Sequence, residues 1–236
     1  MAVIAENKSI AQGIWRMRLK GAPLGKAGQF VMLRIPGVLD PFLGRPISLC
    51  DSEGDELTLL YQVMGRGTTL FSGLIPGQNM DVQGPYGNGF PFVEGDAVII
   101  GGGIGSAPMY LLAKSLRAAQ PNRRISVYLG FREEAYYAEE FKDYADSVQV
   151  NIGGFVTQDV DFTQNATYYA CGPSPMLRAA AQAAQSANAR MYVSLERHMA
   201  CGVGACLGCT CKTAHGGKRV CKDGPVFDYT EVQHAL

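Results

Sequence analysis

Five of the seven cysteines in this chain lie in one short stretch near its C-terminus. Cys201, Cys206 and Cys209 follow the spacing C-x4-C-x2-C, and Cys221 comes after eleven further residues. This spacing is typical of the thiolate ligands of a plant-type 2Fe-2S cluster. Glycines between the cysteines would let the backbone turn tightly and direct N–H groups at the cluster sulfurs. We therefore predict a redox cluster held by these four cysteines.

The fifth cysteine of the stretch, Cys211, leaves two alternatives open. It could exchange with a neighbouring ligand, or it could be a free thiol close to the cluster. Zinc is the alternative metal, but structural zinc sites favour two short cysteine pairs, and Cys221 has no such partner. A zinc site would make this segment part of a non-enzymatic, metal-stapled binding module.

A glycine-rich turn follows the apolar run Ala97–Ile100. Its residues are Gly101, Gly102, Gly103, Ile104, Gly105 and Ser106. Glycine permits close approach of the backbone, and the N-terminus of a following helix offers free N–H groups to a diphosphate. Ser106 stands where the dinucleotide motif has its third glycine, so a plain strand-to-helix turn is the alternative.

A second candidate turn, formed by Cys171, Gly172 and Pro173, ends a later predicted strand. Ligands of open α/β sheets lie at the carboxyl ends of the strands, so both turns could face one crevice. The alternative for Cys171 is a small buried apolar residue.

The first half of the chain holds a third set of candidate binding residues. They are Arg45, Pro46, Ile47 and Ser48 at a strand start, and Tyr61, Gln62, Val63, Gly67 and Thr68 leading into a short helix. An arginine beside a serine could bind a phosphate and a ring nitrogen, and a helix start suits an anion. The alternative is a surface ion pair beside an ordinary turn.

Composition restricts the partners of the chain. Its 236 residues are 47% apolar and 18% charged with a formal net charge of zero, which indicates neither a nucleic-acid-binding patch nor an acidic tail. The N-terminus lacks the features of a signal peptide, and no apolar run could span a membrane. We expect a cytoplasmic protein, in which crowded cysteines favour metal binding over disulfides.

Two kinds of secondary structure must position these residues. Short strands separated by Gly and Pro predict a small β-barrel or sandwich, with strands at 14–19, 29–35, 46–50, 57–63 and 80–83. From residue 95 strands and helices alternate, which predicts a parallel sheet covered on both faces. Its strands are expected at 97–100, 125–130, 148–152, 168–170 and 191–195, and its helices at 107–119, 136–144 and 175–187.

In this order the motifs resemble the ferredoxin reductase-like flavoproteins, and with the cysteine spacing the chain looks like the electron-transfer subunits of type B dihydroorotate dehydrogenase. The eleven-residue gap before Cys221 fits that family better than reductases with an appended ferredoxin domain. The resemblance implies an FAD-binding β-barrel over 1–94, a Rossmann-like NAD-binding α/β domain over 95–196 and a 2Fe-2S lobe over 197–236.

The resemblance also implies a role for each motif. Arg45 and Ser48 would hold the FAD diphosphate and flavin ring, with the remaining barrel motif residues completing the FAD site. The Gly101–Ser106 turn would face the NAD diphosphate, and Cys171–Pro173 would lie near the nicotinamide. Arg132 could reach a 2′-phosphate, whereas Glu133 and Glu134 would repel one and favour NAD over NADP. The alternative is that all three residues are a solvated helix start.

The implied function is electron transfer by a hetero-oligomer. NAD(H) exchanges two electrons and a cluster one, so FAD belongs between them, and no acid–base or nucleophilic residue set is needed. An FMN-containing dihydroorotate dehydrogenase catalytic subunit would be the partner, in pyrimidine biosynthesis. The alternative is a reductase subunit of another complex, hydrogenase or NADPH-linked.

Overall fold

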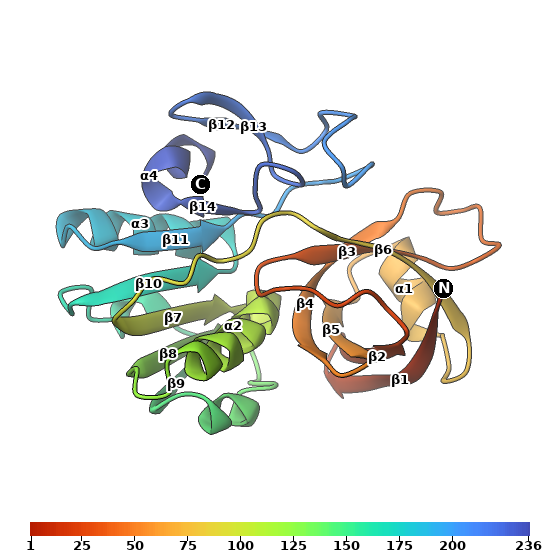
Figure 1. Cartoon of the computed structure of the whole chain (residues 1–236), viewed down its shortest axis with the longest axis horizontal. Helices are drawn as coiled ribbons and strands as arrows, with labels where there is room; N and C mark the ends of the chain where they lie inside the picture. Colours follow the sequence, from red (N-terminus) through yellow and green to blue (C-terminus); the bar gives the residue numbers. More distant parts are fainter.

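An antiparallel barrel occupies the first third of the chain in the structure, a computed structural model that describes residues 1–236. Its strands are β1 (Ala2–Ala11), β2 (Ile14–Lys20), β3 (Phe30–Arg34), β4 (Arg45–Glu53), β5 (Glu56–Gln62) and β6 (Asn79–Tyr86). They follow the order β1-β2-β5-β4-β3-β6, and β1 closes the barrel against β6. Helix α1 (Arg66–Ser72) follows β5, and Figure 1 shows the barrel in red to yellow.

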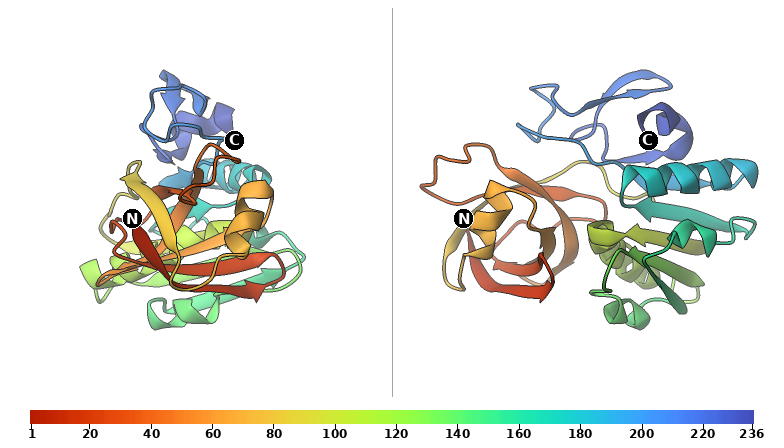
Figure 2. Two further views of the ribbon diagram at one scale, coloured as in Figure 1. Left: turned by 90° about the vertical axis from the view of Figure 1, so that its right-hand side faces the viewer. Right: turned by 180° about the vertical axis from the view of Figure 1, so that it is seen from behind.

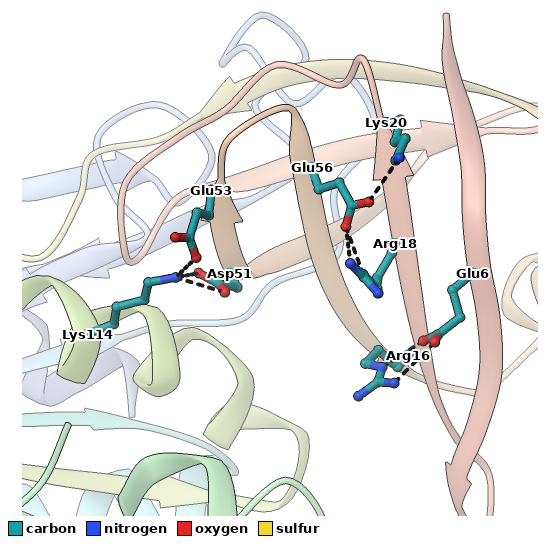
Figure 3. Close-up of polar contacts among 8 residues, drawn as sticks. All are labelled: Glu6, Arg16, Arg18, Lys20, Asp51, Glu53, Glu56 and Lys114. Atoms are coloured by element: carbon teal, nitrogen blue, oxygen red, sulfur yellow. Dashed lines mark hydrogen bonds and ion pairs between the residues drawn. The ribbon is translucent and has the colours of Figure 1, made fainter. Parts of the chain in front are cut away.

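The barrel strands alternate between an apolar interior and a charged exterior, as period-2 patterning requires. On β2, Met17 and Leu19 are fully buried, while Arg16 and Arg18 between and beside them point outward. On the outer face Arg16 pairs with Glu6 at 2.7 Å, and Glu56 of β5 binds both Arg18 and Lys20 (Figure 3). Such exposed pairs add little stability, so the interior holds the barrel together.

A six-stranded sheet with order β14-β11-β10-β7-β8-β9 forms the second half. Its strands are β7 (Asp96–Gly102), β8 (Ile125–Phe131), β9 (Ser147–Ile152), β10 (Ala166–Cys171), β11 (Met191–Ser194) and β14 (Val226–Asp228). All are parallel except β14, which pairs antiparallel with β11. Helices α2 (Ser106–Ala119) and α3 (Ser174–Ser186) lie on opposite faces (Figures 1 and 2). The predicted barrel and Rossmann-like sheet are thus confirmed.

Residues of β7 are buried on both faces of the sheet. Ile99 belongs to the apolar cluster that includes α2, and Val98 and Ile100 belong to the one that includes α3. A parallel sheet covered on both faces needs this continuous apolar run. The carboxyl end of β7 therefore carries the glycine turn to a fixed place at the sheet edge.

The helix predicted at 136–144 is wrong. The structure has a short 3-10 turn at Glu139–Asp143, preceded by Tyr137 with φ of +56°. A left-handed residue breaks an α-helix. Tyr137, Phe141 and Tyr144 pack edge-on around Tyr110 of α2, so aromatic packing determines the path of this segment.

The C-terminal segment has more regular structure than its composition predicts. A hairpin of β12 (Thr210–Thr213) and β13 (Gly216–Arg219) precedes β14, and a short helix α4 (Tyr229–Val232) follows it. The segment lies above both the barrel and the sheet (Figure 1) and gives the sheet an edge strand, β14. The division of the chain at residues 94 and 196 stays a proposal.

Helix α2 joins the sheet to the barrel. Lys114 of α2 binds Asp51 of β4 at 3.0 Å and Glu53 at 2.5 Å (Figure 3), and the backbone N–H of Gln12 donates to Glu134 at 2.7 Å. None of the helices has the length and apolar character needed to span a lipid bilayer.

Candidate functional site

A cavity of about 430 Å³ lies between the barrel and the sheet, within the range of volumes found for cofactor sites. Its barrel wall comes from Phe30, β4 and β5, and its sheet wall comes from the start of α2, the end of β10 and the segment after β11. The predicted residues that line it are Arg45, Pro46, Ile47, Ser48, Tyr61, Gln62, Thr68, Gly105 and Cys171. Residues about 150 positions apart thus meet in one site.

Eight predicted residues lie outside the wall of this cavity. They are Val63, Gly67, Gly101, Gly102, Gly103, Ser106, Gly172 and Pro173. Val63 packs against the barrel core. Gly67 lies under Arg45, where a Cβ atom would come within 3.1 Å of the arginine Cγ, so this glycine lets Arg45 lie against α1.

Arg45 and Thr68 are held by backbone contacts beside the cavity. The Arg45 guanidinium donates to the carbonyl oxygens of Leu43 at 2.8 Å and Gly44 at 3.2 Å. The Thr68 hydroxyl accepts from the N–H of Met64 at 3.0 Å at the start of α1. No acidic side chain pairs with Arg45, which leaves its charge available to an anion.

The two glycine turns predicted to face one crevice do contact each other. A Cβ on Gly105 would lie 2.6 Å from the carbonyl oxygen of Cys171, so only glycine permits this approach. Behind Gly105, the hydroxyl of Ser106 is buried with no hydrogen-bond partner. A buried polar atom without a partner is costly, and a bound group that completes it would fit this helix start.

Glu196 is a cavity residue that the sequence prediction missed. β10 and β11 run parallel with Cys171 opposite Ser194, which brings Glu196 to the same edge. Glu196 is exposed as a residue, but the cavity walls around its carboxyl reduce its hydration and raise its pKa. Burial, with the nearby Glu196 charge, also raises the pKa of the Cys171 thiol, which therefore stays protonated at neutral pH. The signal available in the sequence was the position of Glu196 directly after a predicted strand.

The four predicted cluster cysteines form two pairs. The N–H of Cys206 donates to Cys201 Sγ at 3.4 Å, and the N–H of Cys221 donates to Cys209 Sγ at 3.4 Å. The N–H of Gly208 donates to Cys206 Sγ at 3.5 Å. No three His, Cys, Asp or Glu side chains are grouped as one metal ion would require. Two thiol pairs with N–H donors fit a cluster of two irons with two protein sulfurs each.

The backbone already favours thiolate at one of these positions. Hydrogen bonds from the N–H groups of Cys206 and Val203 lower the pKa of Cys201 to about 6. At Cys221, burial and the neighbouring Cys209 raise the pKa to about 12. Cys211 lies on β12, is buried, and has a pKa raised by burial.

One layer of side chains separates the cavity from the cysteine loop. Met199 lines the cavity, and Cys201 follows two residues later. On the barrel side Phe30 lines the cavity and packs on Tyr86 with ring centroids 6.0 Å apart, and a Cβ on Gly202 would come within 3.4 Å of Tyr86. The cavity and the thiol pairs are therefore neighbours.

A barrel, a parallel sheet and a cysteine lobe around this cavity define the ferredoxin reductase-like class of flavoproteins. Residues 196–233 match the family model "Iron-sulfur cluster binding domain of dihydroorotate dehydrogenase B". The "Dihydroorotate dehydrogenase B (NAD(+)), electron transfer subunit" of Clostridium perfringens is 40% identical, over 98% of this chain and 96% of the relative. That of Caldanaerobacter subterraneus is 39% identical, over 98% and 97%. The chain belongs to the family of dihydroorotate dehydrogenase B electron transfer subunits.

Solved structures agree with this fold. The structure titled "Insights into flavin-based electron bifurcation via the NADH-dependent reduced ferredoxin-NADP oxidoreductase structure" has a TM-score of 0.88 and 26% identity, and covers 98% of this chain and 89% of its own. Phthalate dioxygenase reductase has a TM-score of 0.64 and 23% identity, over 83% and 68% of the two chains. The second likeness is one of fold alone.

Proposed function

We propose that this chain carries electrons between a 2Fe-2S cluster, FAD and NAD(H) as the electron transfer subunit of a dihydroorotate dehydrogenase B. Its partner, an FMN-containing catalytic subunit, would oxidise dihydroorotate to orotate in the cytoplasm, as part of pyrimidine biosynthesis. That oxidation yields two electrons and two protons, and reduction of NAD⁺ takes up both electrons and one proton. The electrons would pass singly through this chain in a hetero-oligomer.

A single observation carries the proposal. The segment from Ser194 to Met199 lines the cavity between barrel and sheet and then leads directly into Cys201. A cofactor in this cavity would therefore contact the strand ends of the nucleotide sheet on one side and lie next to the thiol pairs on the other. A relay between a two-electron and a one-electron carrier requires this adjacency.

The residues of the chain would bind and orient its cofactors. Bound FAD would supply the exchange between two-electron and one-electron transfer. Arg45 offers an unpaired guanidinium to a diphosphate, and Ser48 a hydroxyl to the flavin ring. The turn at Gly105 lets a nucleotide approach the sheet edge, where the protonated Cys171 thiol adds no charge beside the nicotinamide.

NAD is the proposed nucleotide, and Glu133 is the residue that favours it over NADP. Glu134 accepts a hydrogen bond from Gln12 in the barrel, so it is engaged in the contact between barrel and sheet. Glu133 is exposed beside Arg132 after β8. Its carboxylate would repel a 2′-phosphate and tolerate a ribose hydroxyl.

The deciding experiment is a dihydroorotate:NAD⁺ assay with the catalytic subunit, run with and without this chain. We expect NAD⁺ reduction only when both are present, and NADH-dependent dye reduction by this chain alone. Equal NAD⁺ reduction without the chain would refute the proposal.

A second candidate function is that of a reductase subunit in an electron-bifurcating complex. It is favoured by the likeness to the NADH-dependent reduced ferredoxin-NADP oxidoreductase, which covers 98% of this chain. The higher identity to dihydroorotate dehydrogenase B subunits favours the first candidate. Co-purification from the native cell distinguishes them, because the first requires a subunit that oxidises dihydroorotate and the second does not.

A further inference from the structure

Two cavities lie between the barrel and the C-terminal lobe, and Asn88 lines both of them. A cavity of about 330 Å³ on one side and another of about 380 Å³ on the other are both lined by Asn88. The second cavity also reaches Cys221, one of the proposed cluster ligands. Asn88 therefore lies between two cavities, at the contact of the barrel with residues 223–226 of the lobe.

The side chain of Asn88 binds the lobe as a strand would. The N–H of Val226 donates to Asn88 Oδ1 at 3.0 Å, and Asn88 Nδ2 donates to the carbonyl oxygen of Val226 at 2.7 Å. Nδ2 also donates to the backbone carbonyl oxygen of Asp223 at 3.4 Å. The backbone N–H of Asn88 donates to the carbonyl oxygen of Gly224 at 2.7 Å. Val226 opens β14, whose other edge pairs with β11. The amide thus occupies the free edge of β14.

The segment that Asn88 binds forms one rigid turn with Cys221. Asp223 accepts from the Arg219 guanidinium at 2.9 and 3.0 Å and from its backbone N–H at 2.8 Å, and its own N–H donates to the Arg219 oxygen at 2.7 Å. Cys221 lies inside this closed turn, and its N–H reaches Cys209 Sγ. Any displacement of residues 223–226 would therefore carry Cys221 with it.

We propose that Asn88 is a positioning residue that fixes the turn holding Cys221, and with it the cluster, against the barrel that binds the flavin. The inference rests on the proposed function, because it assigns the residue that holds the two redox groups at their working separation. Asn88 contacts neither group directly. Packing provides fewer constraints. Gly87 lies against Gly224 and Pro225, and Val226 lies near Gly28 and Phe90, but neither contact binds the backbone of Asp223 or Val226.

Two variants of the full chain, purified with FAD and cluster, test the proposal. Asn88→Ala removes all three side-chain contacts. Asn88→Asp keeps the shape and the acceptor for Val226 N–H, but replaces the donor with a carboxylate facing two carbonyl oxygens. Asn165→Asp, an exposed asparagine with no side-chain bond at the opposite end of the sheet, is the matched control.

NADH is mixed with each protein, and flavin reduction is followed by stopped-flow absorbance and cluster reduction by rapid-freeze EPR. We expect both Asn88 variants to slow cluster reduction at least about tenfold and to change the EPR line shape, with flavin reduction within about twofold of wild type. Loss of iron with FAD retained would support the proposal equally, because displacing Cys221 removes a ligand.

Cluster reduction at the wild-type rate with an unchanged EPR signal in both Asn88 variants would overturn the inference. Equal slowing in the Asn165 variant would also overturn it. A wild-type chain that binds no cluster reducible by NADH would instead refute the proposed function, so the two failures are distinguishable.

Discussion

Replacing Lys114 by methionine tests whether one ionic contact fixes the sheet against the barrel. Lys114 Nζ lies 3.0 and 3.1 Å from the two Asp51 oxygens, and both side chains are only about one-fifth exposed, at 20% and 19%. Glu53, the other partner, is 74% exposed, so its contribution is small. Methionine keeps most of the stem and leaves the Asp51 carboxylate without its cation.

The expected cost lies between that of an exposed pair and that of a buried one. Exposed pairs contribute up to about 1 kcal/mol and breaking a buried pair costs about 3–5 kcal/mol, so we expect about 2 kcal/mol for Lys114→Met. In a chain of this length that lowers the melting temperature by about 4–8 °C. Asp51→Asn in the same chain should restore roughly half of the loss, because the unpaired charge is then removed.

Thermal unfolding of the FAD-loaded protein measures both effects. Lys142→Met is the control, because Lys142 and Glu139 form a pair whose side chains are 58% and 80% exposed, so its loss should cost less than about 0.5 kcal/mol. Burial lowers the pKa of Lys114, but its bonds to Glu53 and Asp51 outweigh this and raise it above 10.5. The contribution of Lys114 to the free energy of unfolding should therefore be fully present below pH 10.5 and be lost as the pH rises through the raised pKa. A Lys114 variant as stable as the Lys142 variant would refute the reasoning.

Two further predictions concern the site. Cys209→Ser should abolish the cluster absorbance and leave FAD bound, whereas Cys211→Ser should keep both; visible spectra and iron analysis distinguish them, and an equal loss in both variants would place Cys211 among the ligands. Glu196→Gln should be more stable than wild type at pH 8 and no more stable near pH 4. Reduced hydration raises the Glu196 pKa, so the native state favours the neutral carboxyl. Below the ordinary pKa of 4.5 the carboxyl is neutral and does not destabilise the fold, and as the pH rises through the raised pKa it ionises and stability is lost. Melting curves at both pH values measure this, and a constant difference would contradict it.

Local patterns in the sequence predicted most of the barrel and sheet. Buried and less buried residues alternate from Met17 to Lys20 in β2 and from Glu56 to Leu59 in β5, which is the period of a strand with one buried face. β7 is apolar over Ala97–Ile100, as expected of a strand buried on both faces. β1 was missed because only Ala2 and Ile4, near its start, are buried, while its later residues are partly or fully exposed and Glu6 pairs with Arg16 on the outer face. The segment around Tyr137 was read as a helix because tertiary aromatic packing, and not its own periodicity, determines its path.

In the candidate site, too, the residues that lie close together in the sequence could be predicted, and those brought together by the fold could not. The cysteines are close in the sequence, so their spacing alone predicted four cluster ligands, and the structure adds how they pair. The spacing C-x4-C-x2-C assigned Cys209 to the cluster and left open whether Cys211 exchanges with a ligand or stays a free thiol. In the structure Cys209 precedes β12 and bonds with Cys221, whereas Cys211 lies within the strand. Glu196 and Asn88 depend on strand pairing between distant segments, which no local pattern contains.

The C-terminal lobe combines two kinds of stabilisation, and this explains how so small a segment can hold a cluster. Val226, Phe227, Tyr229 and Val232 are buried against the sheet, so β14 and α4 are anchored by apolar packing without metal. The cysteine-bearing loop has glycines and exposed residues instead, and depends on thiol pairing and on the contacts of Asp223 and Asn88. The anchored part fixes where the loop begins and ends, so metal binding has to order only the loop between these points.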